Sequence, residues 1–268
     1  MRKKKRAELC PKEVEIFTRE YVEIITTFPG ELVLNMDETA WNFVFKRGEV
    51  FAEIGVEEVE AGLPDDFRKS FTVITTISAA GEKFPPLFLA KGKTPICHRQ
   101  FNGMETNRQL FNIFHSPGGN TDDDAMEFYL DLVKDWVGSL HCVLILDRYP
   151  SHTSARTREN AAKRNIRLVF IPKSGTEKFQ PLDRRVFGVL KSSAASKFCG
   201  HVFQFQRGST KSEAADIFME CWKRLNPSTV RSAWNIDGED EEDEEVDSSD
   251  SEFEINSSND GSDDSDAE

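Results

Sequence analysis

Two short apolar runs in this chain each end in an aspartate, and they constrain the fold more than any other feature. Residues 31–36 lead to Asp37, and residues 142–146 lead to Asp147. Apolar runs of this length, bounded by polar residues, are typical of buried strands. A helical pattern over 154–164 and a third apolar run over 166–171 follow Asp147. This order of strand, helix and strand with short connections predicts a parallel unit, and therefore an α/β fold.

The rest of the pattern predicts further strands and helices around these runs. Residues 71–78 and 84–89 are separated by a turn, which indicates a hairpin, and Pro85 and Pro86 place its second arm at a sheet edge. Residues 95–120 show no clear period and are expected to be irregular. Other expected elements are a helix at 12–26, a strand at 41–46, a long helix from 181, and helices at 212–224 and 227–234.

Three adjacent aspartates occupy positions 122–124, directly after Thr121. Acidic side chains at this place suggest a metal site, but an amphipathic segment over 125–140 follows them. Small polar and acidic residues cap helix N-termini and stabilise the first turn. We attribute these aspartates to helix capping.

Asp37 and Asp147 are expected at the ends of neighbouring strands, and Asp183 in the first turn of the helix after the next strand. Strand ends of this kind meet at one edge of the sheet, where the active sites of open α/β folds lie. Three carboxylates at one place repel each other unless cations lie between them, and oxygen ligands favour Mg²⁺ or Mn²⁺ over zinc. The residues alone leave a second explanation open, because acids often end strands where turns begin.

Several ordered motifs resemble the pogo/Tigger transposases and their relatives, which include the family of centromere protein B and jerky. Around the acids, LNMDET at 34–39 resembles N-x-D-E-T, and LILD at 144–147 with Ser151 and His152 is similar to L-L-D-N-x-x-S-H. The segment 166–172 followed by QPLD at 180–183 resembles the motif of the third acid, with Phe187 and Lys191 after it. Residues 74–87 with KGK at 91–93 resemble the strand–turn–strand motif, and 222–234 resembles the closing helices.

The resemblance covers residues 30–236 and implies a ribonuclease H-like fold with a mixed central sheet flanked by helices. It implies that Asp37, Asp147 and Asp183 are catalytic and bind two Mg²⁺ or Mn²⁺ ions. It further implies a DDE endonuclease domain over 31–236 that binds DNA, cleaves and transfers strands, forms a homo-oligomer and acts in the nucleus. Residues 1–30 would form a basic start and a short helix.

Departures from the motifs leave the activity open. Arg148 stands where the family has Asn, and its guanidinium would either pair with Asp147 and compete with an ion or point away. At most about 30 residues precede the first strand, too few for a helix-turn-helix module. The alternative function is therefore a domesticated, catalytically inactive nuclear DNA-binding or interaction protein. His152 is expected to bond the loop after its strand, and Lys191, Arg184 and Arg185 are candidates for DNA phosphate contacts.

Charge is strongly segregated along the chain. The net charge is −13, yet residues 237–268 contain 17 Asp and Glu and no Lys or Arg, so residues 1–236 carry about +4. The tail is expected to be disordered, and its charge leaves two roles open: it keeps the chain soluble, or it contacts basic proteins. The basic run RKKKR at 2–6 suggests nuclear import or phosphate binding. Five scattered cysteines predict neither disulfides nor a zinc knuckle, and no apolar stretch reaches the length of a membrane span.

Overall fold

A computed structural model of the chain describes residues 9–42, 70–102, 104, 110–205 and 209–236, with the backbone alone for 199–205. The chain divides into two units, residues 1–236 and 237–268. The predicted acidic tail is the second unit, and it lies outside the described residues, as does the basic run at 2–6.

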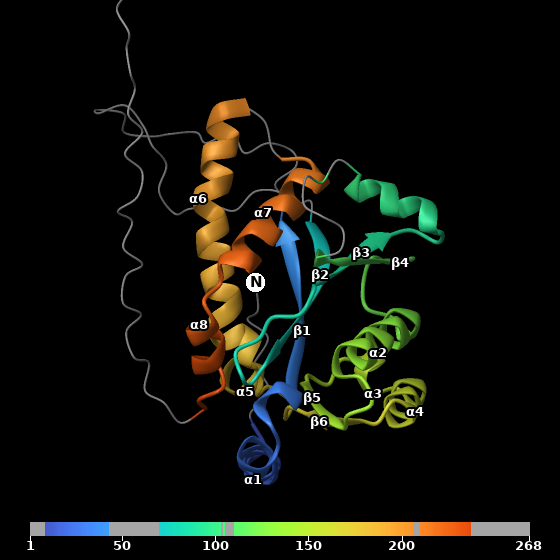
Figure 1. Ribbon diagram of the computed structural model, residues 1–268, viewed down its shortest axis with the longest axis vertical. Coiled ribbons are helices and arrows are strands. Elements are labelled where there is room, and N and C mark those ends of the chain that lie inside the picture. Colours follow the sequence, from blue (N-terminus) through green and yellow to red (C-terminus); the bar gives the residue numbers. More distant parts are fainter. Residues whose placement is uncertain (1–8, 43–69, 103, 105–109, 206–208, 237–268) are drawn as a thin grey trace, which may run out of the picture. The chain divides into compact units, whose positions relative to one another are not determined.

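Six strands form one mixed sheet in the order β4-β3-β2-β1-β5-β6 (Figure 1). β1 pairs antiparallel with β2 on one side and parallel with β5 on the other, so it lies at the centre of the sheet. β2 and β3 are antiparallel, whereas β3 with β4 and β5 with β6 are parallel pairs. The strands are β1 Val33–Asn42, β2 Ser70–Ser78, β3 Leu87–Lys91, β4 Asn112–Ser116, β5 Cys142–Leu146 and β6 Ile166–Phe170.

The expected helices all form. The helix from residue 181 starts as a π-helical turn, η5 Leu182–Val186, and continues as α6 Phe187–Phe205. The other helices are α1 Pro11–Thr27, α2 Asp123–Val137, α3 Pro150–Thr153, α4 Ala155–Lys163, α5 Thr176–Phe179, α7 Lys211–Arg224 and α8 Pro227–Ser232, with 3₁₀ turns η1 Gly30–Leu32 and η3 Pro95–Phe101.

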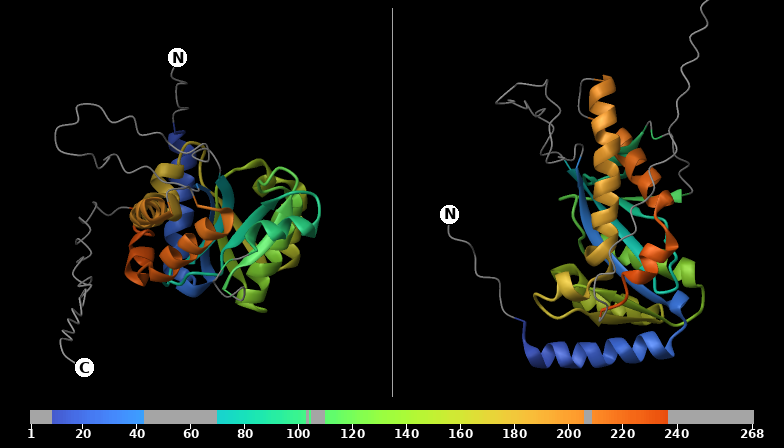
Figure 2. Two further views of the ribbon diagram at one scale, coloured as in Figure 1. Left: turned by 90° about the horizontal axis from the view of Figure 1, so that it is seen from above. Right: turned by 90° about the vertical axis from the view of Figure 1, so that its left-hand side faces the viewer.

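The two faces of β1 belong to two hydrophobic cores. Val33 and Trp41 pack in one core with buried side chains of α6 and α7, whereas Leu34 and Met36 pack in the other with those of α2. Alternate residues of a strand face opposite sides of its sheet, which explains this division. Figures 1 and 2 show α6, α7 and α8 on one side of the sheet and α2 and α4 on the other. The α/β class with a mixed sheet flanked by helices is therefore confirmed.

The strand order also confirms the ribonuclease H-like fold. β1, β2 and β3 form an antiparallel meander, and β5 and β6 continue the sheet parallel to β1 on its other side. α4 carries the chain from β5 to β6, as a parallel pair requires. β1 and β5 are thus direct neighbours, although their paired residues lie 110 positions apart in the sequence.

Three local predictions were wrong. The strands expected at 31–37 and 41–46 are one strand as far as Asn42, because β1 pairs with β2 continuously from Leu34 to Asn42. Residues 43–46 lie outside the described part. The segment 95–120 contains η3 and β4, and β4 takes the edge position expected for the second hairpin arm.

Candidate active site

Asp37 and Asp147 come together because β1 and β5 diverge next to them. The last parallel pair between these strands joins Asn35 to Ile145, and each aspartate follows its paired residue by two positions. Asp147 follows the end of β5, as predicted, but Asp37 lies within β1, because pairing with β2 continues past the point where β5 ends. The two carboxylates therefore flank the place where the two strands separate.

Asp183, in η5, contacts Asp37 directly. The two side chains lie close enough for a hydrogen bond between their carboxyl groups, and this interaction acts to lower the pKa of Asp183. Asp37 is buried, with 7% of its surface exposed. Burial raises the pKa of Asp37 well above its usual range, and the charges of Asp183 and Glu38 add to the effect. Burial also raises the pKa of Asp183, and the nearby charge of Asp147 contributes, against the opposing charge of Lys191.

Asp147 acts on Asp183 through its charge and is held in place by hydrogen bonds within its own loop. Its Oδ1 accepts hydrogen bonds from the Tyr149 amide at 3.0 Å and from His152 Nδ1 at 2.7 Å. Burial alone would raise the pKa of Asp147, but the hydrogen bond and charge of His152 outweigh it and lower that pKa. The structure thus brings Asp37 and Asp183 into contact and places Asp147 near enough to Asp183 for its charge to raise the pKa of that carboxyl group.

Two buried amides fix the elements that carry these acids. Asn35 Nδ2 donates to the carbonyl of Ile145 at 2.9 Å and to Gln180 Oε1 at 3.0 Å, and its Oδ1 accepts from the Leu182 amide. Gln180 Nε2 donates to the carbonyl of Met36 at 3.0 Å. Both side chains are 0% exposed. This network joins β1, β5 and the start of η5, so it sets the separation of the acids.

Glu38 and His152 are functional candidates that the sequence did not identify as a pair. His152 is fully buried, and its Nε2 lies 3.0 Å from Glu38 Oε1. Burial opposes protonation of the ring, but the hydrogen bonds and charges of Asp147 and Glu38 raise the pKa of His152 to about 10. The predicted contact with its own loop is present at Asp147, whereas the contact to β1 was missed. The only signal for it was the presence of both residues in motifs that also contain an acid.

Arg148 points away from the acids. Its Nη1 lies 3.7 Å from Glu13 Oε1 of α1. Arg148 was expected either to pair with Asp147 or to point away from it. The structure favours the second alternative. Arg184, a candidate phosphate contact, donates instead to the carbonyls of Ala233 and Asn235. Lys191 Nζ lies 5.6 Å from the centre of the Phe187 ring. Its positive charge acts to lower the pKa of Asp183.

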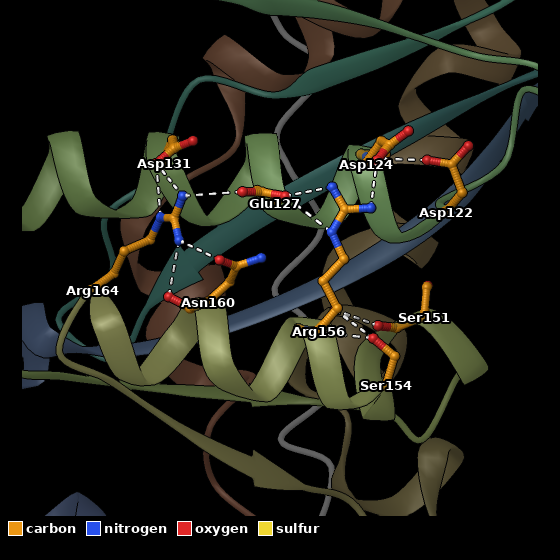
Figure 3. A network of polar contacts seen from close by, with 11 residues as sticks. Asp122, Asp124, Glu127, Asp131, Ser151, Ser154, Arg156, Asn160 and Arg164 are labelled. Atoms are coloured by element: carbon orange, nitrogen blue, oxygen red, sulfur yellow. Dashed lines mark hydrogen bonds and ion pairs between the residues drawn. The ribbon is translucent and has the colours of Figure 1, made fainter.

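The aspartates at 122–124 serve helix capping, as expected, and one of them also forms an ion pair that was not expected. Asp122 Oδ1 accepts from the Ala125 amide at the start of α2, and Asp124 pairs with Arg156 of α4 at 2.6 Å. Figure 3 shows a second arginine, Arg164, extending this network between the two helices. Arg164 donates to Asp131 at 2.7 Å. These contacts tie α2 to α4.

The carboxyl groups of Asp37 and Asp183 fit a divalent cation by their chemistry. The pKa of both carboxyl groups is raised, so negative charge at this place lacks compensation, and carboxylate oxygens are the ligands that Mg²⁺ and Mn²⁺ take. Within the described ranges, however, no three His, Cys, Asp or Glu side chains are arranged around one point as a metal site. His152 and Tyr149 hold Oδ1 of Asp147, whereas no hydrogen bond from the described residues engages its Oδ2.

A family model matches more than half of the chain. The family model described as DDE superfamily endonuclease matches residues 68–234. CENP-B homolog protein 2 of Schizosaccharomyces pombe is 23% identical over 224 residues, covering 81% of this chain and 41% of that protein. A protein named MFS-type transporter clz9, from Cochliobolus lunatus, is 22% identical over 200 residues, covering 70% and 22%. The chain thus spans less than half of either relative. In the part of the chain that the structure describes, no helix has the length and apolar character to cross a membrane.

Solved structures of the Mos1 transposase are similar at low identity. The paired-end complex with the left transposon end aligns with a TM-score of 0.49 and 13% identity, covering 88% of this chain and 67% of that one. Other Mos1 paired-end complexes contain Mn or Mg.

Proposed function

This chain belongs to the DDE superfamily of endonucleases, and on that premise we propose that it binds DNA and cuts and joins DNA strands with divalent metal ions. Its transposase-like domain would carry the reaction, with Asp37, Asp147 and Asp183 as the catalytic ligands of two Mg²⁺ or Mn²⁺ ions. The observation that carries this proposal is the contact between Asp37 and Asp183 beside the charge of Asp147. We also propose a nuclear location, which the basic run at 2–6 supports.

The chain's own residues would position the reaction. Asn35 and Gln180 fix the distance between the strand acids and Asp183 through hydrogen bonds that are fully buried. When bound, divalent ions would supply activation of a water or a 3′-hydroxyl and stabilisation of the leaving oxygen. Asp37 and Asp183 would hold an ion in their ionised form, because a cation offsets the repulsion between two carboxylates.

DNA binding has independent support in the charge distribution. Residues 1–236 carry a charge of about +4, once the 17 acids of the tail are set aside. A positively charged domain attracts the phosphate backbone without regard to sequence. A homo-oligomer and contacts of the tail with basic proteins belong to the proposal as expectations.

Nicking of supercoiled plasmid in Mg²⁺ and in Mn²⁺ tests the proposal. We expect the wild type to nick and Asp37→Asn and Asp183→Asn to fall to the level of the metal-free reaction. Asp135→Asn is the matched control, since Asp135 lies on the exposed side of α2. Arg148→Asn should nick like the wild type, because Arg148 faces Glu13.

The same assay separates the alternative function. Nicking only by Arg148→Asn would show a catalytic domain silenced at that position. A folded wild type that binds duplex DNA but cuts in neither metal would contradict the enzyme proposal and support an inactive, domesticated DNA-binding protein.

A further inference from the structure

A buried histidine lies between two carboxylates that belong to different strands. His152, in α3, is 0% exposed, with Nδ1 2.7 Å from Asp147 Oδ1 and Nε2 3.0 Å from Glu38 Oε1. Both ring nitrogens face carboxylate oxygens, so the ring donates on both sides. Hydrogen bonds between charged partners are short and strong and fix their geometry.

The strand geometry turns the Glu38 side chain to the face of the sheet opposite Asp37. Asp37 and Glu38 are neighbours on β1, so their side chains face opposite sides of the sheet. Asp37 faces the side of Gln180 and Asp183, whereas the charge of Glu38 contributes to the raised pKa of Tyr129, which packs with α2 in the other core. Glu38 therefore acts on Asp147 only through His152.

This arrangement gives the two carboxylate oxygens of Asp147 different surroundings. Oδ1 receives both hydrogen bonds, from His152 and from the Tyr149 amide. Oδ2 receives none from the described residues, and the charge of Asp147 acts on Asp183. A carboxylate turned in this way offers a metal ion one oxygen.

We propose that Glu38 and His152 are positioning residues, which hold Asp147 through Oδ1 so that Oδ2 binds a divalent ion together with Asp183. This inference rests on the proposed function and extends it, because it assigns roles to two residues that do not contact the ion. Glu38 fixes the ring, the ring fixes the carboxylate, and the carboxylate meets the ion in one orientation. Partners of metal ligands act in this way, and their loss typically lowers metal affinity 10–100-fold.

Glu38, His152 and Asp147 form a relay, in which each side chain orients the next. Binding of Mn²⁺ to the full chain, followed by electron paramagnetic resonance, tests this relay without relying on activity. We expect His152→Ala to weaken Mn²⁺ binding about 10–100-fold. Glu38→Ala should weaken it as well, but Glu38→Gln, which keeps an oxygen acceptor for His152 Nε2, should retain most of the affinity. His141→Ala is the matched control, because His141 is exposed and bonds to Asn165 away from the acids.

The double variant decides whether the two residues act in series. If Glu38 works through His152, Glu38→Ala should cause no further loss in the His152→Ala background. Additive losses would instead mean that Glu38 acts directly on Asp37, and they would overturn the relay. Should His152→Ala fail to fold, the same cycle is run with His152→Gln.

Two further outcomes separate this inference from the proposed function. Wild-type Mn²⁺ affinity in a folded His152→Ala or His152→Gln variant would overturn the relay alone. No Mn²⁺ binding by the wild type would overturn both the relay and the metal-dependent function.

Discussion

Asn35 shows how a single buried side chain controls the site. Its amide bonds the carbonyl of Ile145, Gln180 and the amide of Leu182, and it is fully buried. A polar group left unpaired in the interior costs far more than a hydrogen bond contributes. Asn35 therefore matters to stability and to the placement of the acids at once.

Asn35→Ala should lower the free energy of unfolding by about 3 kcal/mol, because the Leu182 amide and Gln180 Oε1 lose their partner. Urea denaturation of both proteins measures the difference. Asn120→Ala, at an exposed loop position, is the control and should change stability by less than about 0.5 kcal/mol. An Asn35→Ala variant as stable as this control would show that the network does not hold the elements together.

Cys142 gives a prediction on pH. Burial raises the pKa of this thiol from 9.0 to about 11. The neutral form is thus favoured in the fold, so its contribution to stability is complete below pH 9 and is lost as the pH rises towards 11. Since the thiolate is the reactive form, iodoacetamide at pH 8.5 should label the exposed Cys10 and leave Cys142 unlabelled until urea is added. Peptide mass spectrometry reads the sites, and early labelling of Cys142 in the native protein would contradict the prediction.

The sequence predicted the three acids but not the side chains that hold them. Asp37, Asp147 and Asp183 stand in recognisable local positions, after apolar runs and at a helix start. The contact between Glu38 and His152 joins residues 114 positions apart, and no periodicity or turn signal reports such a pair. It exists because β1 and β5 are neighbours and α3 folds back beside them.

At the scale of elements, regular segments were predictable and edge segments were not. α2 shows a strong apolar stripe with an acidic cap, and it forms where expected. β4 is only partly buried along most of its length, so it lacks both a continuous apolar run and a clean alternation. Its place in the sheet follows from parallel pairing with β3, a contact between distant parts of the chain.

The end of α7 depends on a lysine from the turn before β3. Lys83 Nζ donates to the carbonyls of Trp222, Lys223 and Leu225 at 2.8, 2.9 and 2.6 Å. The last carbonyls of a helix lack partners within the helix, so a cation at this end satisfies them and stabilises the helix dipole.

Lys83→Met should lower the free energy of unfolding by about 2 kcal/mol, because hydrogen bonds from a charged group are lost at partly buried carbonyls. It should also increase amide hydrogen exchange near the C-terminus of α7. Lys93→Met, at an exposed position, is the matched control. Equal exchange in the two variants would mean that α7 ends without help from Lys83.

At the scale of the whole molecule, charge is the property that the sequence alone determines. The acids at 237–268 turn a chain whose remainder carries about +4 into one with a net charge of −13. Long-range electrostatic attraction depends on this total charge, which is the same wherever the tail lies. Any attraction of residues 1–236 for DNA therefore competes with the charge of their own C-terminal segment.

Deletion of 237–268 should accordingly strengthen binding to duplex DNA of arbitrary sequence by about tenfold at low salt, since removing the acids leaves a cationic domain. Fluorescence anisotropy over a series of salt concentrations measures this effect, and the gain should shrink as ions screen the charges. A full-length variant with every Asp and Glu of the tail changed to Asn and Gln is the control. It should bind like the deletion, because its length is kept and its charge removed. If the control binds like the wild type, the tail acts by occupying space, and the charge argument fails. If the deletion also binds no better, residues 1–236 do not attract DNA through their charge, and DNA binding loses its electrostatic support.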